Sequence, residues 1–231
     1  ATIGALRIAV ICDRSTADNL APECEVAFLR PDDWREQISE LRPHVLFVES
    51  AWTGLASEWV GKVSSPSVLL ESIVHSCRAA GIRTVFWNKE DPLHFEAFIA
   101  VAKWFDLVCT TDVSSIPRYK RELGHDNVQL MMFALQPRMH NPIDAGTRVE
   151  GSFFAGAWYG NQPARCKDFM ALADALALVG AFDIYDRNAA SSDPVRRYPT
   201  RYSRFNRGEV AYDETPGLYR RDRVGLSLST I

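Results

Sequence analysis

Residues 1–135 alternate between short apolar runs and helix-like segments, and this alternation leaves few possible architectures. Short apolar runs indicate buried strands, and apolar residues at helical spacing between them indicate crossover helices. Such a pattern predicts βαβ units and a parallel, doubly wound α/β sheet. The predicted strands are 6–12, 26–29, 44–49, 83–87, 106–110 and 128–133, and the predicted helices are 32–41, 68–80, 93–105 and 115–123.

The pattern lapses at residues 136–148, where two prolines and a glycine mark a linker. A second α/β unit follows, with strands at 152–155 and 182–185, a helix at 163–179 and a polar, irregular stretch at 193–206. A short β-prone segment at 209–212, a short helix near 216–221 and a strand at 224–228 complete it. We therefore predict two Rossmann-like units, residues 1–140 and residues 148–231.

The second unit is expected to be truncated after about four strands, because no helix follows its last apolar strand. An uncovered strand of this kind leaves apolar surface and an open edge. The sequence therefore predicts self-association through the C-terminal region.

Composition excludes several classes of function. The net charge of −3 argues against a general nucleic-acid binder, and no apolar run approaches the ~20 residues that span a bilayer. The five scattered cysteines include no Cys-x-x-Cys pair, so buried free thiols in a cytoplasmic protein are expected. Neither a dinucleotide fingerprint nor a phosphate-binding P-loop motif occurs. No cofactor and no metal site are predicted.

The strongest functional signal follows the apolar run 82–87. Asn88, Lys89, Glu90 and Asp91 come directly after it, with His94 one turn later. Ligands of parallel sheets bind at the carboxyl ends of strands, so Glu90 or Asp91 is a candidate general base whose pKa Lys89 and His94 would tune. Two structural interpretations remain open: Asp91 before Pro92 suits a helix N-cap, and Glu90 with Lys89 suits a solvated ion pair.

A second group of candidate site residues, Glu49 and Trp52, follows the apolar run 45–48. Tips of neighbouring strands open into one crevice, so these two residues are expected to lie near residues 88–91, with Trp52 stacking on a sugar face. The alternative is a capped turn with Trp52 packed as a lid.

In the second unit, the turn from Gly156 through Tyr159 to Asn161 lies between a strand and a helix. Backbone amides of such a turn can approach a phosphate, with Arg165 and Arg187 adding positive charge. Glycine also serves turn geometry alone, so this motif is weak.

Several runs resemble the CgeB-like, spore-maturation-type glycosyltransferases, which have the two-domain GT-B fold. The most specific is Trp-Asn-Lys-Glu-Asp-Pro at 87–92, and the others lie at 47–52, 86–95, 110–112, 140–142, 208–212 and 219–221. The resemblance implies transfer of a sugar from a nucleotide-sugar donor to an unknown sugar or glycan acceptor, without a metal. It places the acceptor side in the first unit and the donor side in the second.

In that family an Arg and a Glu ahead of a small Ala-Cys-Gly-like turn also help to hold the donor. This sequence stops at Ile231 without such a segment, so the resemblance implies an incomplete donor site. The competing hypothesis is a non-catalytic glycan- or protein-binding module on the same fold.

Overall fold

Contacts within the chain divide it into unit 1, Ala1–Gln136, and unit 2, Pro137–Ile231. The structure, a computed structural model, describes residues 2–143 and 146–228. The predicted boundaries at 140 and 148 fall in the connecting segment, whose described residues 137–143 and 146–148 include no helix or strand.

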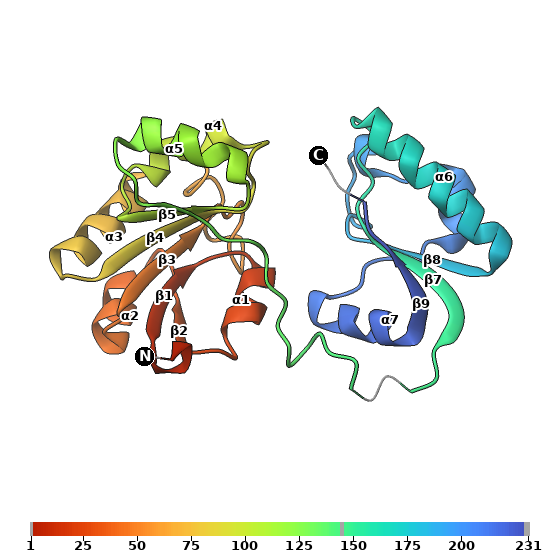
Figure 1. Cartoon of the computed structure of the whole chain (residues 1–231), viewed down its shortest axis with the longest axis horizontal. Coiled ribbons are helices and arrows are strands. Elements are labelled where there is room, and N and C mark those ends of the chain that lie inside the picture. The colour runs from red at the N-terminus through yellow and green to blue at the C-terminus, as the bar shows by residue number, and fades with distance from the viewer. Residues whose placement is uncertain (1, 144–145, 229–231) are drawn as a thin grey trace. The chain divides into compact units, whose positions relative to one another are not determined.

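Unit 1 is built on a six-stranded parallel sheet in the order β2-β1-β3-β4-β5-β6 (Figure 1). The parallel α/β class predicted from the alternation is therefore confirmed, although strand β6 is shorter than expected. The strands are β1 (Arg7–Ile11), β2 (Glu25–Phe28), β3 (Val45–Glu49), β4 (Arg83–Asn88), β5 (Leu107–Thr110) and β6 (Val128–Leu130).

Helices cover both faces of this sheet (Figure 1). Apolar side chains of α2 to α5 share one core cluster with Leu46, Val48 and Phe86, whereas Ala17 of α1 packs with Ile8 on the other face. The helices are α1 (Arg14–Leu20), α2 (Trp34–Leu41), α3 (Val68–Ala79), α4 (Phe95–Ala102) and α5 (Ile116–Leu123), with short 3-10 helices η1 (Ile3–Ala5) and η2 (Val113–Ser115).

Three helices begin one or two residues later than predicted, namely α2, α4 and α5, and helix α1 was not predicted at all. The helix expected from residue 32 begins at Trp34, and Asp33 at its N-cap makes no side-chain cap bond because it pairs with Arg30. Helix α1 escaped detection because its Ser, Thr, Asp and Asn residues are poor helix formers and only Ala17 is buried.

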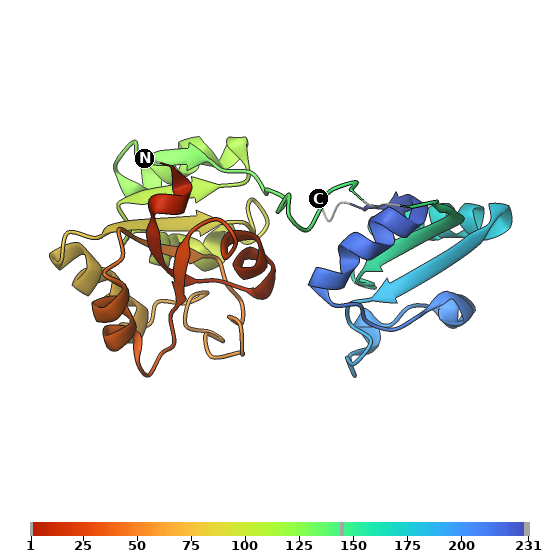
Figure 2. The ribbon, with the colours of Figure 1, turned by 90° about the horizontal axis from the view of Figure 1, so that it is seen from below.

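Unit 2 contains a three-stranded parallel sheet in the order β8-β7-β9, and β7 and β8 run side by side in the same direction (Figure 2). The expectation of about four strands is wrong for the described residues, because residues 209–211 form no strand. The elements are β7 (Val149–Gly156), α6 (Pro163–Val179), β8 (Ala181–Asp186), η3 (Pro194–Arg196), η4 (Thr200–Phe205), η5 (Tyr212–Glu214), α7 (Thr215–Arg221) and β9 (Asp222–Leu226).

Consecutive residues of β7 pack on opposite faces of this sheet. The Phe154 ring centroid lies 5.1 Å from that of Phe169 on α6, and the Phe153 centroid lies 5.0 Å from that of Tyr219 on α7. Side chains alternate along a strand, so this pair fixes which helix covers which face. The stretch 193–206, expected to be irregular, consists largely of η3 and η4, and it adds Tyr198 and Tyr202 to the α6 side of the core.

No helix in the described part of the chain has the length and apolarity needed to cross a membrane. The five cysteines are unpaired, and only Cys24 is partly exposed. The expectation of free, mostly buried thiols is therefore confirmed.

Candidate functional site

Polar residues gather at the carboxyl edge of the unit 1 sheet. Asp13 lies two residues after the end of β1. The last residues of β3, β4 and β5 are Glu49, Asn88 and Thr110. Glu49, Asn88 and Thr110 are fully buried, which is costly for polar groups unless each is hydrogen-bonded. The hydrogen bonds at this edge fall into two adjoining networks, one around Glu49 and one around Asp91.

The first network is an ion cluster of Asp13, Glu49 and Lys89. Lys89 Nζ lies 2.8 Å from Glu49 Oε1 and 3.4 Å from Asp13 Oδ2. Glu49 also accepts hydrogen bonds from the Asp13 backbone N–H and from the Thr16 hydroxyl. Lys89 is thus a largely buried partner of two carboxylates, and the solvated Glu90–Lys89 pair considered from the sequence is not what forms.

Burial and charge act in opposite directions on this cluster. Burial raises the pKa of Glu49, and the Lys89 ammonium beside it opposes that rise. Burial alone would lower the pKa of Lys89, but the Glu49 and Asp13 carboxylates outweigh it and raise that pKa. The raised pKa keeps the Lys89 ammonium charged at neutral pH, within reach of the carboxyl groups of both Glu49 and Asp13.

Asp13 positions the loop that carries Trp52. Its carboxylate accepts hydrogen bonds from the backbone N–H groups of Trp52, Thr53 and Gly54 at 3.3, 3.2 and 2.8 Å. Gly54 has a φ of 78° and packs against the Trp59 side chain, so a residue with a Cβ would be strained there.

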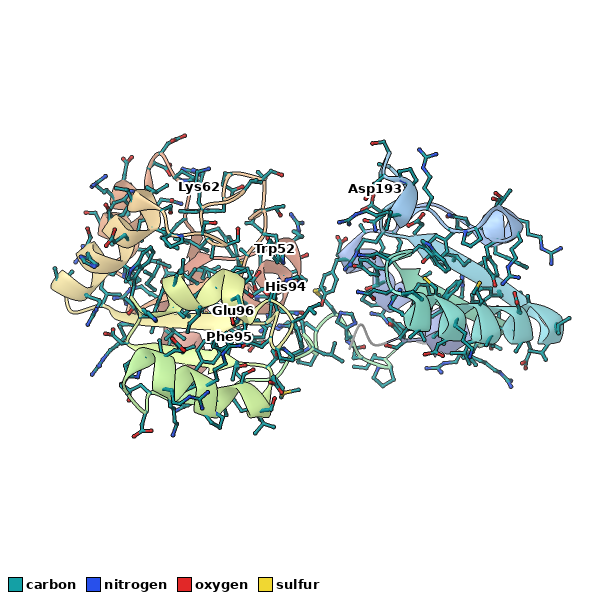
Figure 3. All side chains as sticks on the ribbon, turned by 90° about the horizontal axis from the view of Figure 1, so that it is seen from above. Trp52, Lys62, His94, Phe95, Glu96 and Asp193 are labelled. Atoms are coloured by element: carbon teal, nitrogen blue, oxygen red, sulfur yellow. The ribbon has the colours of Figure 1, made fainter. Side chains whose placement is uncertain are left out.

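Trp52 and His94 form an edge-on aromatic pair at this edge, with ring centroids 5.1 Å apart (Figure 3). Trp52 also packs edge-on against Phe98, 5.2 Å away, yet 39% of its surface remains exposed. The packed lid considered from the sequence therefore does not describe Trp52 fully. One side of the indole is held in place, and the rest is accessible to a ligand.

The second network centres on Asp91, which is 5% exposed. Its Oδ1 accepts hydrogen bonds from Asn88 Nδ2 at 2.8 Å and the Tyr119 hydroxyl at 3.3 Å, and its Oδ2 accepts one from the Thr110 hydroxyl at 2.6 Å. Burial raises the pKa of Asp91 to about 6, although the hydroxyl donors favour the carboxylate.

The N-cap role considered for Asp91 is wrong. Helix α4 begins at Phe95, its N-cap residue is His94, and no side chain caps it. The segment 89–94 forms turns instead, and the peptide bond between Asp91 and Pro92 is cis. The Asp91 carboxylate thus ties the end of β4 to β5 and α5.

Glu90 is the acidic residue of this loop that is least engaged. Its backbone N–H donates to Asn88 Oδ1 at 3.1 Å, and the residue is partly exposed. Its negative charge contributes to the raised pKa of Lys89. The structure therefore brings together all seven unit 1 residues singled out from the sequence. Three of them are accessible to solvent: Trp52, Glu90 and His94. The other four are largely buried: Glu49, Asn88, Lys89 and Asp91.

In unit 2, the turn after β7 brings Tyr159, Arg165 and Arg187 together. The Arg187 guanidinium donates to the Tyr159 hydroxyl at 2.8 Å, and the Arg165 guanidinium lies 4.9 Å from the Tyr159 ring centroid. Arg165 also donates to the Ala157 carbonyl at 3.0 Å, while its buried Nε has no hydrogen-bond partner in the described part of the chain. Asn161 is exposed and joins none of these contacts.

Gly156 is the last residue of β7, and its carbonyl joins this turn to the end of β8. It accepts the Arg187 backbone N–H at 3.2 Å and the Tyr198 hydroxyl at 3.1 Å. A Cβ at Gly156 would lie 2.6 Å from the Phe154 ring, so packing alone favours glycine here.

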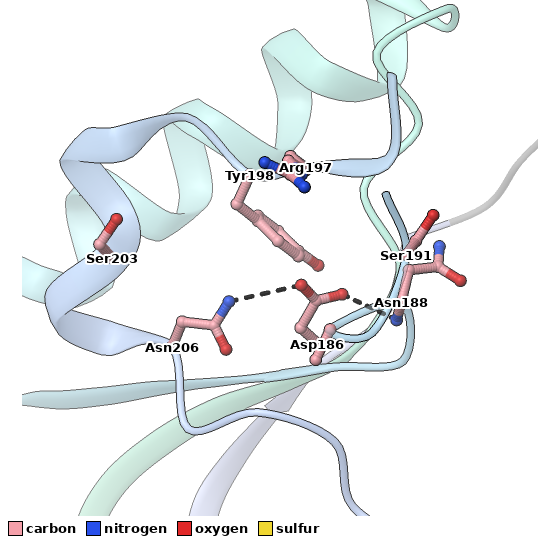
Figure 4. Close-up of a pocket in the computed structure, with 8 residues that line it drawn as sticks. Asp186, Asn188, Ser191, Arg197, Tyr198, Ser203 and Asn206 are labelled. Atoms are coloured by element: carbon pink, nitrogen blue, oxygen red, sulfur yellow. Dashed lines mark hydrogen bonds between the residues drawn. The ribbon is translucent and has the colours of Figure 1, made fainter. Parts of the chain in front are cut away.

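A cavity of about 220 Å³ opens beside the end of β8 (Figure 4). Its walls are mostly polar and come from β8, the following loop and η4. The lining residues are Asp186, Asn188, Ala189, Ser191, Arg197, Tyr198, Ser203 and Asn206.

The sequence alone missed several residues of these networks. In unit 1 they are Asp13, Thr16, Thr110 and Tyr119, and in unit 2 they are Asp186 and Tyr198. Three of them follow or end an apolar strand, which is the same signal that singled out Glu49 and Asn88. Tyr119 lies within a helix, and no local pattern marks it.

No protein-family model and no curated protein matches this chain. Within residues 2–143 and 146–228, no three His, Cys, Asp or Glu side chains are grouped so that they could hold a metal ion.

Proposed function

We propose that the protein handles a nucleotide sugar as a GT-B-type glycosyltransferase, with the donor bound by unit 2 and a sugar or glycan acceptor bound by unit 1. The observation that carries this proposal is the convergence of Arg165 and Arg187 on Tyr159 at the start of α6. Positive charge beside the N–H groups of a helix start favours a diphosphate, the leaving group of such a reaction.

Unit 1 supplies features that suit an acceptor. The exposed part of Trp52 offers an aromatic surface to a sugar ring, and His94 holds the indole from the side. Glu90 lies in the same loop and is partly exposed, so it is the residue we assign to the acidic role. Asp91 and Glu49 are buried and hydrogen-bonded, and we assign them to positioning the loops.

A non-catalytic binding module is the second candidate, and one observation favours it. Both buried carboxylates at the unit 1 edge are engaged: Glu49 by Lys89, and Asp91 by Asn88, Thr110 and Tyr119. If these carboxylates only hold the loops in place, none of them acts as a catalytic base. The exposed aromatic surface of Trp52 would then bind glycans without turnover.

Titration calorimetry with UDP-, GDP- and CDP-linked sugars tests the donor assignment. We expect one nucleotide class to bind, and Arg187→Ala to weaken its binding at least tenfold, because a charge-assisted contact is worth about 1.5–3 kcal/mol. Arg223→Ala is the matched control, because Arg223 is exposed and pairs with Glu150 at 2.7 Å. Absence of binding by every nucleotide sugar would contradict the proposal.

Turnover separates the two candidates. The enzyme assignment expects hydrolysis or transfer of the bound nucleotide sugar that is lost in Glu90→Gln while donor binding is kept. The binding-module assignment expects glycan binding that Trp52→Ala weakens and that ignores nucleotide.

A further inference from the structure

The cavity at the end of β8 contains a buried carboxylate that the described residues leave only partly satisfied. Asp186 is 5% exposed and has no ion pair within residues 2–143 and 146–228. One oxygen accepts the Asn188 backbone N–H at 2.9 Å, and the other accepts Asn206 Nδ2 at 3.4 Å (Figure 4).

A carboxylate has about four acceptor sites, so two of those on Asp186 remain for a ligand. Leaving a buried charge with few partners is costly, and a ligand that donates two hydrogen bonds would offset that cost.

The size and lining of the cavity limit what can fill it. Its volume of about 220 Å³ is below the ~300–1,000 Å³ of sites that enclose a whole drug-sized ligand, so it suits a single sugar-sized ring. Ser191 and Ser203 bring hydroxyl groups to the lining. Arg197 makes no side-chain hydrogen bond or ion pair in the described part of the chain. A polyhydroxylated ring with a nearby negative charge matches these groups.

Tyr198 gives the cavity a fixed aromatic wall. Its ring centroid lies 5.6 Å from that of Trp158 and 5.4 Å from that of Phe169, and its hydroxyl donates to the Gly156 carbonyl. The hydroxyl is therefore already used, and the ring is held where a sugar face can lie against it. A rigid wall of this kind lowers the entropy lost when a ligand binds.

The topology places this cavity next to the proposed diphosphate site. In a β-α-β unit, phosphate groups bind at the first strand-to-helix turn, and an acidic residue at the end of the next strand can hydrogen-bond the ribose hydroxyls. Here the turn follows β7 and the acidic residue is Asp186 at the end of β8. The Gly156 carbonyl links the two places, because it accepts both the Arg187 N–H and the Tyr198 hydroxyl.

We propose that the Asp186 cavity binds the ribose of a nucleoside diphosphate, with both hydroxyls of the 2′,3′-diol donating to the Asp186 carboxylate. The inference rests on the proposed donor site of unit 2, since the Arg165 and Arg187 cluster would hold the diphosphate. It adds a requirement that the donor-site assignment does not make: the vicinal diol itself is recognised.

Calorimetric titration of the whole protein with UDP, GDP and CDP, each beside its 2′-deoxy counterpart, tests this requirement. We expect the ribonucleotide to bind about 10- to 100-fold more tightly than its deoxy form, the range for one hydrogen bond to a charged group. In ¹⁵N-labelled protein, the Asn188 amide signal is expected to shift with the ribonucleotide, because that N–H donates to Asp186.

The variant Asp186→Asn is expected to bind both forms within about twofold of each other. Its amide has a single acceptor oxygen with two lone pairs, and one of these stays bonded to the Asn188 N–H, so the side chain can no longer accept from both hydroxyls. Asp168→Asn is the matched control, since Asp168 is exposed on α6, and it is expected to keep the wild-type preference.

The ratio of ribonucleotide to deoxynucleotide affinity in the wild-type protein tests the inference without any variant. The test therefore holds even if Asp186→Asn misfolds. Equal affinity for the ribo and deoxy forms overturns the diol inference and leaves the donor site standing. Binding of none of the three nucleotides overturns both. A shift of the Asn188 signal with free ribose or methyl glucoside, but with no nucleotide, would identify the cavity as a site for a free sugar and likewise overturn the inference.

Discussion

Lys89 Nζ donates to Glu49 Oε1 at 2.8 Å, although 40 positions separate the two residues in the sequence. Glu49 is the last residue of β3, Lys89 directly follows β4, and these strands are neighbours in the sheet. The pair therefore forms because parallel neighbours end at the same edge, and each charge is buried where the other can reach it. Removing one partner of this ion pair measures how much the stability of unit 1 depends on it.

Lys89→Met is expected to lower the free energy of unfolding by about 3–5 kcal/mol, because two carboxylates are left near a buried site without their cation. Adding Glu49→Gln to it should recover part of the loss. Urea unfolding of the two single variants and the double variant measures this coupling.

Lys103→Met is the control for that cycle, because Lys103 pairs with Glu122 at 3.5 Å on the surface. Its cost should stay below about 1 kcal/mol, as for most exposed pairs. Equal losses at Lys89 and Lys103 would contradict the importance given to burial.

Asp91 should make the stability of unit 1 depend on pH. Its pKa of about 6 in the folded protein exceeds the ordinary value for Asp near 3.9, so the folded state binds that proton more strongly than the unfolded state does. Between pH 4 and 6 the contribution of Asp91 to the free energy of unfolding therefore falls as pH rises, by up to about 3 kcal/mol. Subtracting the urea-unfolding curve of Asp91→Asn from that of the wild type isolates this slope.

Asp33→Asn provides the contrast, because Arg30 lowers the pKa of Asp33. The stability from that ion pair is present above the ordinary pKa and is lost only as pH falls below about 4. The wild-type minus Asp33→Asn difference should thus be flat from pH 4 to 7. A flat difference for Asp91→Asn as well would show that Asp91 titrates alike in the folded and unfolded chains.

Gly156→Ala should destabilise unit 2 by about 1–3 kcal/mol, because the added Cβ overlaps the buried Phe154 ring. Gly217→Ala in α7, where a Cβ meets no atom within 4 Å, should instead be neutral or stabilise by up to about 1 kcal/mol. Thermal unfolding compares the two. A stable Gly156→Ala protein that no longer binds nucleotide would indicate that the glycine serves the ligand and not the packing.

The edge of β9 is expected to promote self-association. Within the described residues β9 pairs only with β7, and Val224 on it is 46% exposed. Open apolar edges pair with other chains, so sedimentation velocity should show a mass that grows with concentration, and Val224→Lys should suppress it. A monomer at every concentration in both proteins would rule this out.

The fold of unit 1 was predictable because strands of a parallel sheet are buried on both faces and therefore appear as apolar runs. Helix α1 was not, since its stability comes from Ala17 and its neighbours packing on the sheet and not from its own sequence. In unit 2, the fourth strand was expected from β-prone residues near 209–212. Within the described residues the chain instead meets the edge of β8 earlier, through an isolated bridge between Ile184 and Asn206 and a backbone hydrogen bond from Asp186 to Gly208, and residues 209–211 form no strand.

The candidate site was predictable where a polar residue ends an apolar run, as Glu49 and Asn88 do. The sequence could not show which side chains these polar residues bind. Asp91 precedes Pro92 and so looks like a helix N-cap, yet its carboxylate accepts hydrogen bonds from Thr110 and Tyr119. Those two residues are brought to Asp91 by sheet order and by the packing of α5, which no local window contains.

The shared carbonyl of Gly156 has one more consequence. Because Tyr198 and Arg187 are bound to the same oxygen atom, a displacement of either alters the geometry of the other. If unit 2 binds a nucleoside diphosphate as proposed, binding of its nucleoside half and of its diphosphate half would therefore be coupled. A fragment carrying only one half would bind more weakly than independent contributions predict. Such a turn would distinguish ligands by the whole molecule and not by either half alone.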